Sequence, residues 1–233
     1  MKVQIWSDFV CPFCYIGKRR LEQAIERFPN ELQIEVEYKS FQLDPHASIY
    51  QGKSIHEAIA EKYNIPVDRA IQSNKQIGEQ AKAVGLHFAF DTMKPTNTFD
   101  AHRLSKYAKT IGKEEAFVNE MLYQYFTLSA LISDHDTLME IAKKVGLPEK
   151  EVDQILLNQE MYANEVNSDQ QLASQLRITG VPFFIFNDKF AISGAQPIET
   201  FMQALEKVLE DESKQWQDLS SHQGSYCDGD NCK

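Results

Sequence analysis

Two cysteines near the amino terminus have the spacing of a redox pair. Cys11 and Cys14 are separated by Pro12 and Phe13, and proline is common in the first turn of a helix. We therefore predict that Cys11 stands at the amino end of a helix, where unpaired N–H groups and the dipole favour a thiolate. A thiolate attacks disulfides, and a second thiol one turn on can resolve the mixed disulfide. The pair predicts dithiol–disulfide exchange; half of a zinc site and two inert buried thiols are the alternatives.

A second pair of cysteines, Cys227 and Cys232, lies at the carboxyl end of the chain. Gly229 between them permits a tight turn that brings the two thiols together, while the neighbouring aspartates disfavour a thiolate by repulsion between like charges. We predict a second redox pair that exchanges electrons with Cys11 and Cys14. Incidental thiols, and a zinc site built from this pair or from all four cysteines, are the alternatives left open.

The first cysteine pair needs a strand before it and a helix after it. Residues 3–9 alternate and are rich in β-branched and aromatic side chains, which predicts a strand, and residues 12–28 continue as a helix. Residues 33–43 alternate between apolar and polar side chains, as a strand with one buried face does. This β–α–β order predicts the start of a mostly parallel sheet.

The middle of the chain, from residue 54 to residue 176, has helical periodicity throughout. Its first helix has a capping box, Ser54 with Glu57. Two apolar strands then follow, residues 178–186 and 189–193, joined by the hairpin signal Asn187-Asp188, and a last helix covers residues 198–210. We predict an α/β fold in which a sheet domain, residues 1–53 and 177–212, is interrupted by a helical domain, residues 54–176, and followed by a tail, residues 213–233.

A proline stands at the start of an apolar strand, where its missing N–H costs a ladder hydrogen bond. If the Val181–Pro182 bond is cis, the backbone N–H and C=O of Val181 are free to pair with an extended substrate peptide. This loop and the Cys11 loop are expected to meet at one end of the sheet. We therefore predict that Val181 and Pro182, together with Pro12 and Phe13, bind substrate.

Four motifs together resemble the FrnE-type branch of the DsbA family: residues 11–17 (CPFCYIG), 97–103 (NTFDAHR), 179–184 (TGVPFF) and 193–197 (SGAQP). The resemblance covers residues 1–210. It implies a thioredoxin-like fold with a large all-helical insertion, and dithiol–disulfide activity on proteins or small molecules with thiols or disulfides. It also implies Cys11 as the nucleophile, Cys14 as the resolving thiol and Pro182 as a cis-proline beside them.

The chain departs from this family between its two cysteines. Periplasmic DsbA oxidants have a histidine where this chain has Phe13, and an uncharged ring cannot help to hold a thiolate, so we expect a less oxidising pair. Oxidase, reductase and isomerase all stay open. Kappa-class glutathione transferases and hydroxychromene-carboxylate isomerases look similar but place serine at the position of Cys11, so a glutathione-dependent enzyme is the alternative. A redox-switched holdase chaperone is the alternative that is not an enzyme.

Three polar residues are further candidates for the site. Asp8 lies three residues before Cys11, and as a buried carboxylate it could carry protons to the thiols; as an exposed residue at a strand end it would do nothing. His102 and Arg103 are expected to line the groove over the thiols, with packing within the helix as the alternative for His102. For His102 we favour packing.

Composition limits the partners and the compartment. The chain has 34 acidic and 24 basic residues, a net charge of −10, and its one dense basic cluster, residues 18–20, is typical of a solvated helix face; we expect no binding to nucleic acid. No apolar run is long enough for a membrane helix, and no secretory signal precedes the first strand. We expect a cytoplasmic protein without a metal or bound cofactor, whose electron partner is a glutathione or thioredoxin-type thiol pool.

Overall fold

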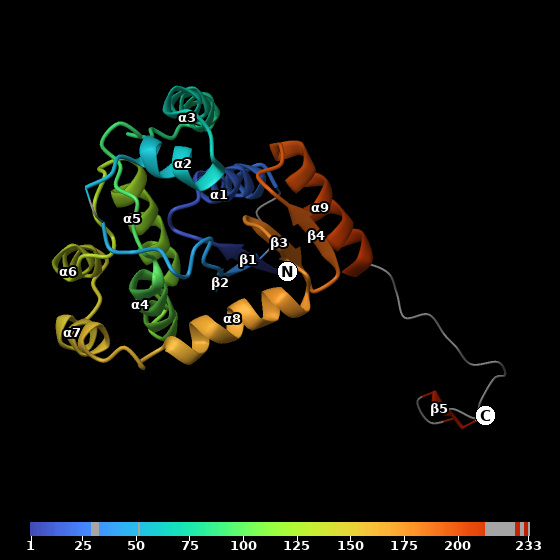
Figure 1. Cartoon of the computed structure of the whole chain (residues 1–233). Coiled ribbons are helices and arrows are strands. Elements are labelled where there is room, and N and C mark those ends of the chain that lie inside the picture. Colours follow the sequence, from blue (N-terminus) through green and yellow to red (C-terminus); the bar gives the residue numbers. More distant parts are fainter. Residues whose placement is uncertain (29–32, 51, 213–226, 229–230, 233) are drawn as a thin grey trace.

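A four-stranded sheet stands at the centre of the computed structural model, which describes residues 1–28, 33–50, 52–212, 227–228 and 231–232 (Figure 1). Its strands are β1 (Lys2–Ser7), β2 (Glu35–Ser40), β3 (Phe183–Phe186) and β4 (Phe190–Ser193), in the order β2-β1-β3-β4. β1 pairs in parallel with β2, but β1–β3 and β3–β4 are antiparallel. The prediction of a mostly parallel sheet is therefore wrong.

The antiparallel part of the sheet follows from its turns. Asn187 and Asp188, which join β3 to β4, have φ angles of 47° and 55°, the left-handed values that a two-residue hairpin needs. The chain also enters β3 at the end of the sheet where β1 finishes, since Trp6 pairs with Phe183. β3 must therefore run back along β1 in the opposite direction.

Helices cover both faces of the sheet (Figure 1). Alternate side chains of β1 and β3, among them Ile5 and Phe184, are buried in the main core with α1 (Pro12–Glu26) and α9 (Ile198–Glu212). The next side chain of β1, Trp6, packs on the opposite face with Ala173 of α8 (Ala163–Gln175). The indole N–H of Trp6 donates to the carbonyl oxygen of Asp169 at 3.1 Å, so its polar atom is satisfied as well as its ring.

The chain between β2 and α8 is helical, as predicted. It contains α2 (Ile55–Tyr63), α3 (Val67–Lys82), α4 (Phe99–Thr110), α5 (Glu114–Phe126), α6 (His135–Lys144) and α7 (Glu149–Leu157). The predicted capping box of Ser54 and Glu57 is present at the start of α2. No helix in the described part of the chain is long and apolar enough to cross a membrane. The division of the chain into two domains stays a prediction.

A buried network of charges fixes α4 and α8 against the edge strand β2. Asp169 of α8 accepts the backbone N–H of Ser40 at 2.9 Å and pairs with Lys106 of α4 at 2.5 Å. Lys106 also donates to the carbonyl oxygen of Tyr38 at 2.8 Å. Because buried charges are tolerated only when they are paired and hydrogen-bonded, this network holds α4 in one position beside the end of β1.

β1 and β3 are shorter than predicted in ways that matter for chemistry. β1 ends at Ser7 rather than at Phe9, because the backbone N–H of Cys11 bonds to the carbonyl oxygen of Asp8 in a turn at 3.1 Å. β3 begins at Phe183 rather than at residue 178, so the residues before it form a loop. The two loops lie at the same end of the sheet.

Candidate active site

The first cysteine lies where these two loops meet. Cys11 is the N-cap of α1, and Pro12 is the first residue of the helix. The thiol of Cys11 donates to the carbonyl oxygen of Val181 at 3.5 Å, and the Val181–Pro182 peptide bond is cis. Strand β1, helix α1 and the loop before β3 therefore place a thiol at a helix amino end, where negative charge is favoured.

The second cysteine is in a different environment. Cys14 is one turn into α1 and 1% exposed, and this burial raises its pKa well above the usual value; a hydrogen bond to Cys11 and the charge of Cys11 raise it further. The hydroxyl of Ser7 and the backbone N–H of Asp8 act in the opposite direction but do not cancel the effect. Cys14 is thus a neutral thiol at physiological pH, and it must lose a proton before it can act as a nucleophile.

A carboxylate and an imidazole are buried behind the thiols. Asp8 is 1% exposed and accepts the backbone N–H of Leu43 at 2.8 Å through one oxygen. Its other oxygen is 3.3 Å from Nε2 of His102 on α4. The ring of His102 packs on Phe9 with 4.8 Å between ring centroids. The structure therefore excludes an exposed position for Asp8, and it gives His102 a buried carboxylate partner rather than a place in a surface groove.

Arg103 does not line a groove over the thiols, contrary to the expectation. It is fully buried, and its guanidinium donates to the carbonyl oxygens of Ile155, Asn158 and Met161. These groups lie at and after the carboxyl end of α7, where carbonyl oxygens lack partners within the helix. Arg103 therefore links α4 to the carboxyl end of α7.

The surface beside Cys11 is apolar. Phe13 and Leu43 are 37% and 40% exposed, and Pro12 and Val181 are half-buried, whereas Cys11 itself is 4% exposed. Of the predicted substrate-binding residues, Pro182 is buried beneath this surface. Leu43 was not predicted, because nothing in its own sequence context shows that it lies near the thiols.

Gly17 was also missed, although it brings α1 close to the cis-proline loop. A Cβ atom at this position would lie 3.1 Å from the ring of Pro182 and 3.1 Å from the ring of Phe184. Glycine in the middle of a helix costs roughly 0.5–1 kcal/mol relative to alanine. A glycine six residues after Cys11, inside a predicted helix, was the signal that could have revealed this close approach.

The backbone places the two carboxyl-terminal cysteines opposite each other. β5 (Cys227–Asp228) and β6 (Asn231–Cys232) pair antiparallel, with Cys227 directly opposite Cys232; Gly229 lies outside the described residues. A role for this pair in electron transfer stays a prediction. Within the part of the chain that the structure describes, no group of three or more histidine, cysteine or acidic side chains could hold a metal ion.

Known proteins share both the sequence and the fold of this chain. A family model described as DSBA-like thioredoxin domain matches residues 2–206. YwbO of Bacillus subtilis (strain 168) is 27% identical over 213 residues, which cover 91% of this chain and 97% of YwbO. The crystal structure of probable DsbA oxidoreductase SCO1869 from Streptomyces coelicolor is 35% identical and covers 100% of this chain and 98% of its own, with a TM-score of 0.86. A 2-hydroxychromene-2-carboxylate isomerase, 17% identical with a TM-score of 0.69 over 95% of this chain and 100% of its own, shares the fold.

Proposed function

The chain belongs to the family of DSBA-like thioredoxin domains, and we propose that it is a thiol–disulfide oxidoreductase that works through Cys11 and Cys14. The observation that carries the proposal is the contrast between the two thiols. One lies at a helix amino end against the carbonyl oxygen of Val181, and the other is buried one turn on with a raised pKa. A nucleophile and a resolving thiol need this difference. Membership of the FrnE branch stays a prediction.

The proposed reaction proceeds through a mixed disulfide. The thiolate of Cys11 attacks one sulfur of a substrate disulfide, a bond forms between these two sulfurs, and the other substrate sulfur leaves with the electron pair. Cys14 then loses its proton and attacks Cys11, which releases the remaining substrate thiolate and forms the Cys11–Cys14 disulfide. The substrate is reduced and the protein is oxidised; the same steps in reverse oxidise a dithiol.

The substrates that we propose are client proteins with accessible thiols or disulfides. Phe13, Pro12 and Val181 supply apolar surface beside Cys11, and Pro182 supports the loop that carries Val181. We propose that the reaction takes place in the cytoplasm, with a glutathione or thioredoxin-type thiol pool as the electron partner and without a resident cofactor.

Nucleic acid and membranes are not among the proposed partners. In the basic cluster of residues 18–20, Lys18 is buried and pairs with Glu22, contrary to the expectation of a solvated face. Arg20 donates to the carbonyl oxygen of Ala195 at 2.5 Å. Lys18 and Arg20 therefore already have partners within the protein, which supports the proposal that this cluster does not bind phosphates.

Disulfide trapping tests the proposal. The variant Cys14→Ala is added to a thiol-blocked lysate, and adducts of high mass that disappear on reduction are counted on a non-reducing gel. We expect adducts with Cys14→Ala and none with the control variant Cys11→Ala/Cys14→Ala. A glutathione adduct on Cys11 in place of protein adducts would favour a glutathione-dependent enzyme. Client binding that persists in Cys11→Ser without turnover would favour a redox-switched holdase.

For the tail we propose that Cys227 and Cys232 exchange electrons with the first pair, supported by their opposed positions in β5 and β6. The variant Cys227→Ser/Cys232→Ser should then lose turnover with an external reductant while Cys11 keeps its reactivity towards a disulfide reagent. Unchanged turnover would make these cysteines incidental.

A further inference from the structure

A groove lies between α1 and α5, with residues of β1 and β2 between the two helices. Its volume of about 790 Å³ is within the range of sites that bind small molecules. The residues that line it belong neither to the Cys11 turn nor to the loop before β3. The groove is therefore distinct from the surface beside Cys11.

The strands give this groove a mostly apolar lining. Ile34, Val36 and Tyr38 alternate along the chain in and just before β2, so their side chains share one face of the strand. Ile5 of β1 and Leu21 of α1 line the groove as well. A ligand with an apolar part would cover these side chains, and binding is favoured in proportion to the apolar area that is removed from water.

The two helices give the groove more carboxylates than cations. The charged lining residues are Glu22, Glu26, Glu115 and Glu120 against Lys18 and Arg19. Both cations are paired with Glu22, and Arg19 also with Glu26. Glu120 pairs with Lys144 beside the groove. Glu115 is exposed, and none of the cations in the described part of the chain pairs with it, so one carboxylate of the groove is left for a ligand.

This surplus of carboxylates affects two tyrosines of the lining. Burial raises the pKa of Tyr38, and the charges of Glu22 and Glu115 raise it further. Burial and Glu22 also raise the pKa of Tyr15, and Arg19 opposes this only in part. Both phenols are therefore neutral at physiological pH. The carboxylates that disfavour a phenolate here would equally disfavour an anionic ligand and favour a cation.

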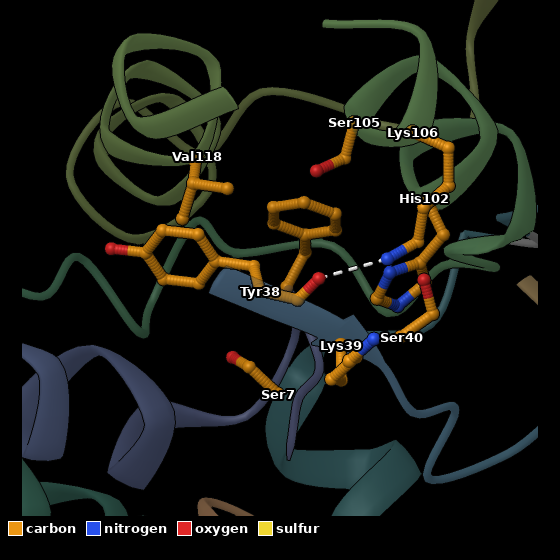
Figure 2. A pocket seen from close by; sticks show the side chains of 9 residues that line it. Ser7, Tyr38, Lys39, Ser40, His102, Ser105, Lys106 and Val118 are labelled. Carbon is orange, nitrogen blue, oxygen red and sulfur yellow. Dashed lines mark hydrogen bonds between the residues drawn. The ribbon is translucent and has the colours of Figure 1, made fainter. Parts of the chain in front are cut away.

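The hydroxyl of Tyr38 is a polar group that lacks a partner. Tyr38 is 7% exposed, and its backbone N–H and carbonyl oxygen are bonded to Glu114 and Lys106, but its hydroxyl bonds to none of the described residues. Figure 2 looks into a small cavity that Tyr38 also lines; there its ring lies beside Val118 and extends away from His102, with the hydroxyl at the far end. Buried hydroxyls are rarely left unsatisfied, so this one needs a partner from within the groove.

Aromatic rings add a further preference for positive charge. Tyr15 of α1 and Tyr123 of α5 both line the groove, and Tyr123 is 43% exposed. The faces of such rings attract ammonium groups. Aromatic rings, an unpaired carboxylate and a hydroxyl without a partner therefore all favour the same kind of ligand group.

We propose that the groove between α1 and α5 binds a small amphipathic amine. Its ammonium group donates to the carboxylate of Glu115 and to the hydroxyl oxygen of Tyr38, and its apolar part covers Ile34 and Val36. An anion would be repelled by the carboxylates, and a neutral apolar molecule would leave Glu115 without a partner. This binding is separate from thiol–disulfide exchange, so Cys11→Ser/Cys14→Ser should bind the amine as the parent does.

Nuclear magnetic resonance of labelled methyl groups tests the proposal on the reduced full-length protein. The probes are 4-phenylbutylamine and its uncharged analogue 4-phenylbutan-1-ol, at neutral pH and low salt. The amine should shift the methyl signals of Ile5, Ile25 and Ile34 in a saturable way and leave those of Ile155 and Ile178 unchanged, since only the first three line the groove. It should bind about 10-fold or more tightly than the alcohol, because its hydrogen bonds are charge-assisted, and added salt should weaken it.

Two variants test the named contacts. Glu115→Gln should weaken binding of the amine about 10-fold and leave binding of the alcohol within about twofold. Glu151→Gln is the matched control, because Glu151 is likewise an exposed acid in the first turn of a helix, α7, but does not line the groove. Tyr38→Phe should weaken the amine about 2- to 10-fold without lowering the stability of the protein, since the hydroxyl that it removes has no partner among the described residues.

Four results would overturn the proposal and leave the proposed function of the cysteines intact. The first is the absence of saturable shifts at the three groove methyls, including shifts found only beside Cys11. The second is equal affinity for the amine and the alcohol. The third is tighter binding of the anionic analogue 4-phenylbutanoate. The fourth is a loss of affinity in Glu151→Gln equal to that in Glu115→Gln. Glu115 is exposed, so its replacement keeps the test valid however Tyr38→Phe folds.

Discussion

Replacing Gly17 by alanine tests whether α1 needs a residue without a side chain where it passes the cis-proline loop. The added methyl group would lie 3.1 Å from the Pro182 ring and 3.1 Å from the Phe184 ring, and 3.4 Å from the Cα atom of Ala195. Pro182 and Phe184 are buried, so neither ring can move into solvent. The methyl group must displace packed atoms.

Two opposing effects set the size of the change. Alanine is favoured over glycine in a helix interior by about 1 kcal/mol. Overpacking of a well-packed core costs about 1–3 kcal/mol. Gly17→Ala should therefore lower the free energy of unfolding by roughly 0–2 kcal/mol. Gly78 in α3 offers the matched control, because its added methyl would meet a single ring atom, of Phe90, at an ordinary 3.9 Å.

Urea unfolding of both variants measures the difference directly. Gly78→Ala should raise the free energy of unfolding by the helix preference of alanine alone, about 1 kcal/mol. The free energies of unfolding of the two variants should therefore differ by about 1–3 kcal/mol. In a chain of this size each kcal/mol changes the melting temperature by about 2–4 °C. Because the displaced Pro182 follows Val181, whose carbonyl accepts the Cys11 thiol, the reaction of Cys11 with an aromatic disulfide should also change in Gly17→Ala. Equal stabilisation by the two substitutions would refute the close-approach argument.

Two further predictions concern buried charges. Arg103→Lys should lower the free energy of unfolding by about 3 kcal/mol, because one ammonium cannot reach both the three carbonyl oxygens bonded by Nη1 and the Asp100 carboxylate bonded by Nε and Nη2. Urea unfolding measures this loss, and a loss no greater than in the exposed control Arg69→Lys would contradict it. Burial acts to raise the pKa of Glu37, but hydrogen bonds from Lys109, Lys2 and Lys39 outweigh it and lower that pKa well below 4.5. Glu37→Gln should therefore be less stable than the parent by about 1–2 kcal/mol near neutral pH, and this difference should be present above pH 4.5 and decrease as pH falls through the lowered pKa; a difference that grows in acid would contradict the sign.

The parts of this structure that were predictable from sequence depend on local chemistry. The helix after Cys11, the capping box at Ser54 and the turn at Asn187 each follow from residues within a few positions of one another. Strand directions do not, because they depend on where the chain re-enters the sheet after the helical segment. The wrong expectation of a mostly parallel sheet came from extending the first β–α–β unit to strands that had not yet been placed.

The polar residues behind the thiols could be predicted only in part. Asp8 was a candidate because it lies close to Cys11 in the chain, but its partner His102 is 94 residues away. The two meet because Lys106, one turn after His102 on α4, is bonded to Tyr38 and Asp169. Such a contact depends on the packing of three separate elements, and the sequence of each element alone does not contain it.

The proposed order in which the two cysteines react rests on their surroundings rather than on the fold. The same fold is found in an isomerase that is 17% identical to this chain, so the fold by itself does not determine the chemistry. Here both side chains are buried, but Cys11 lies at a helix end next to exposed apolar surface, whereas Cys14 lies one turn further into the helix and its pKa is raised. In the proposed reaction the substrate therefore meets Cys11 first, and Cys14 can attack only after it has lost its proton.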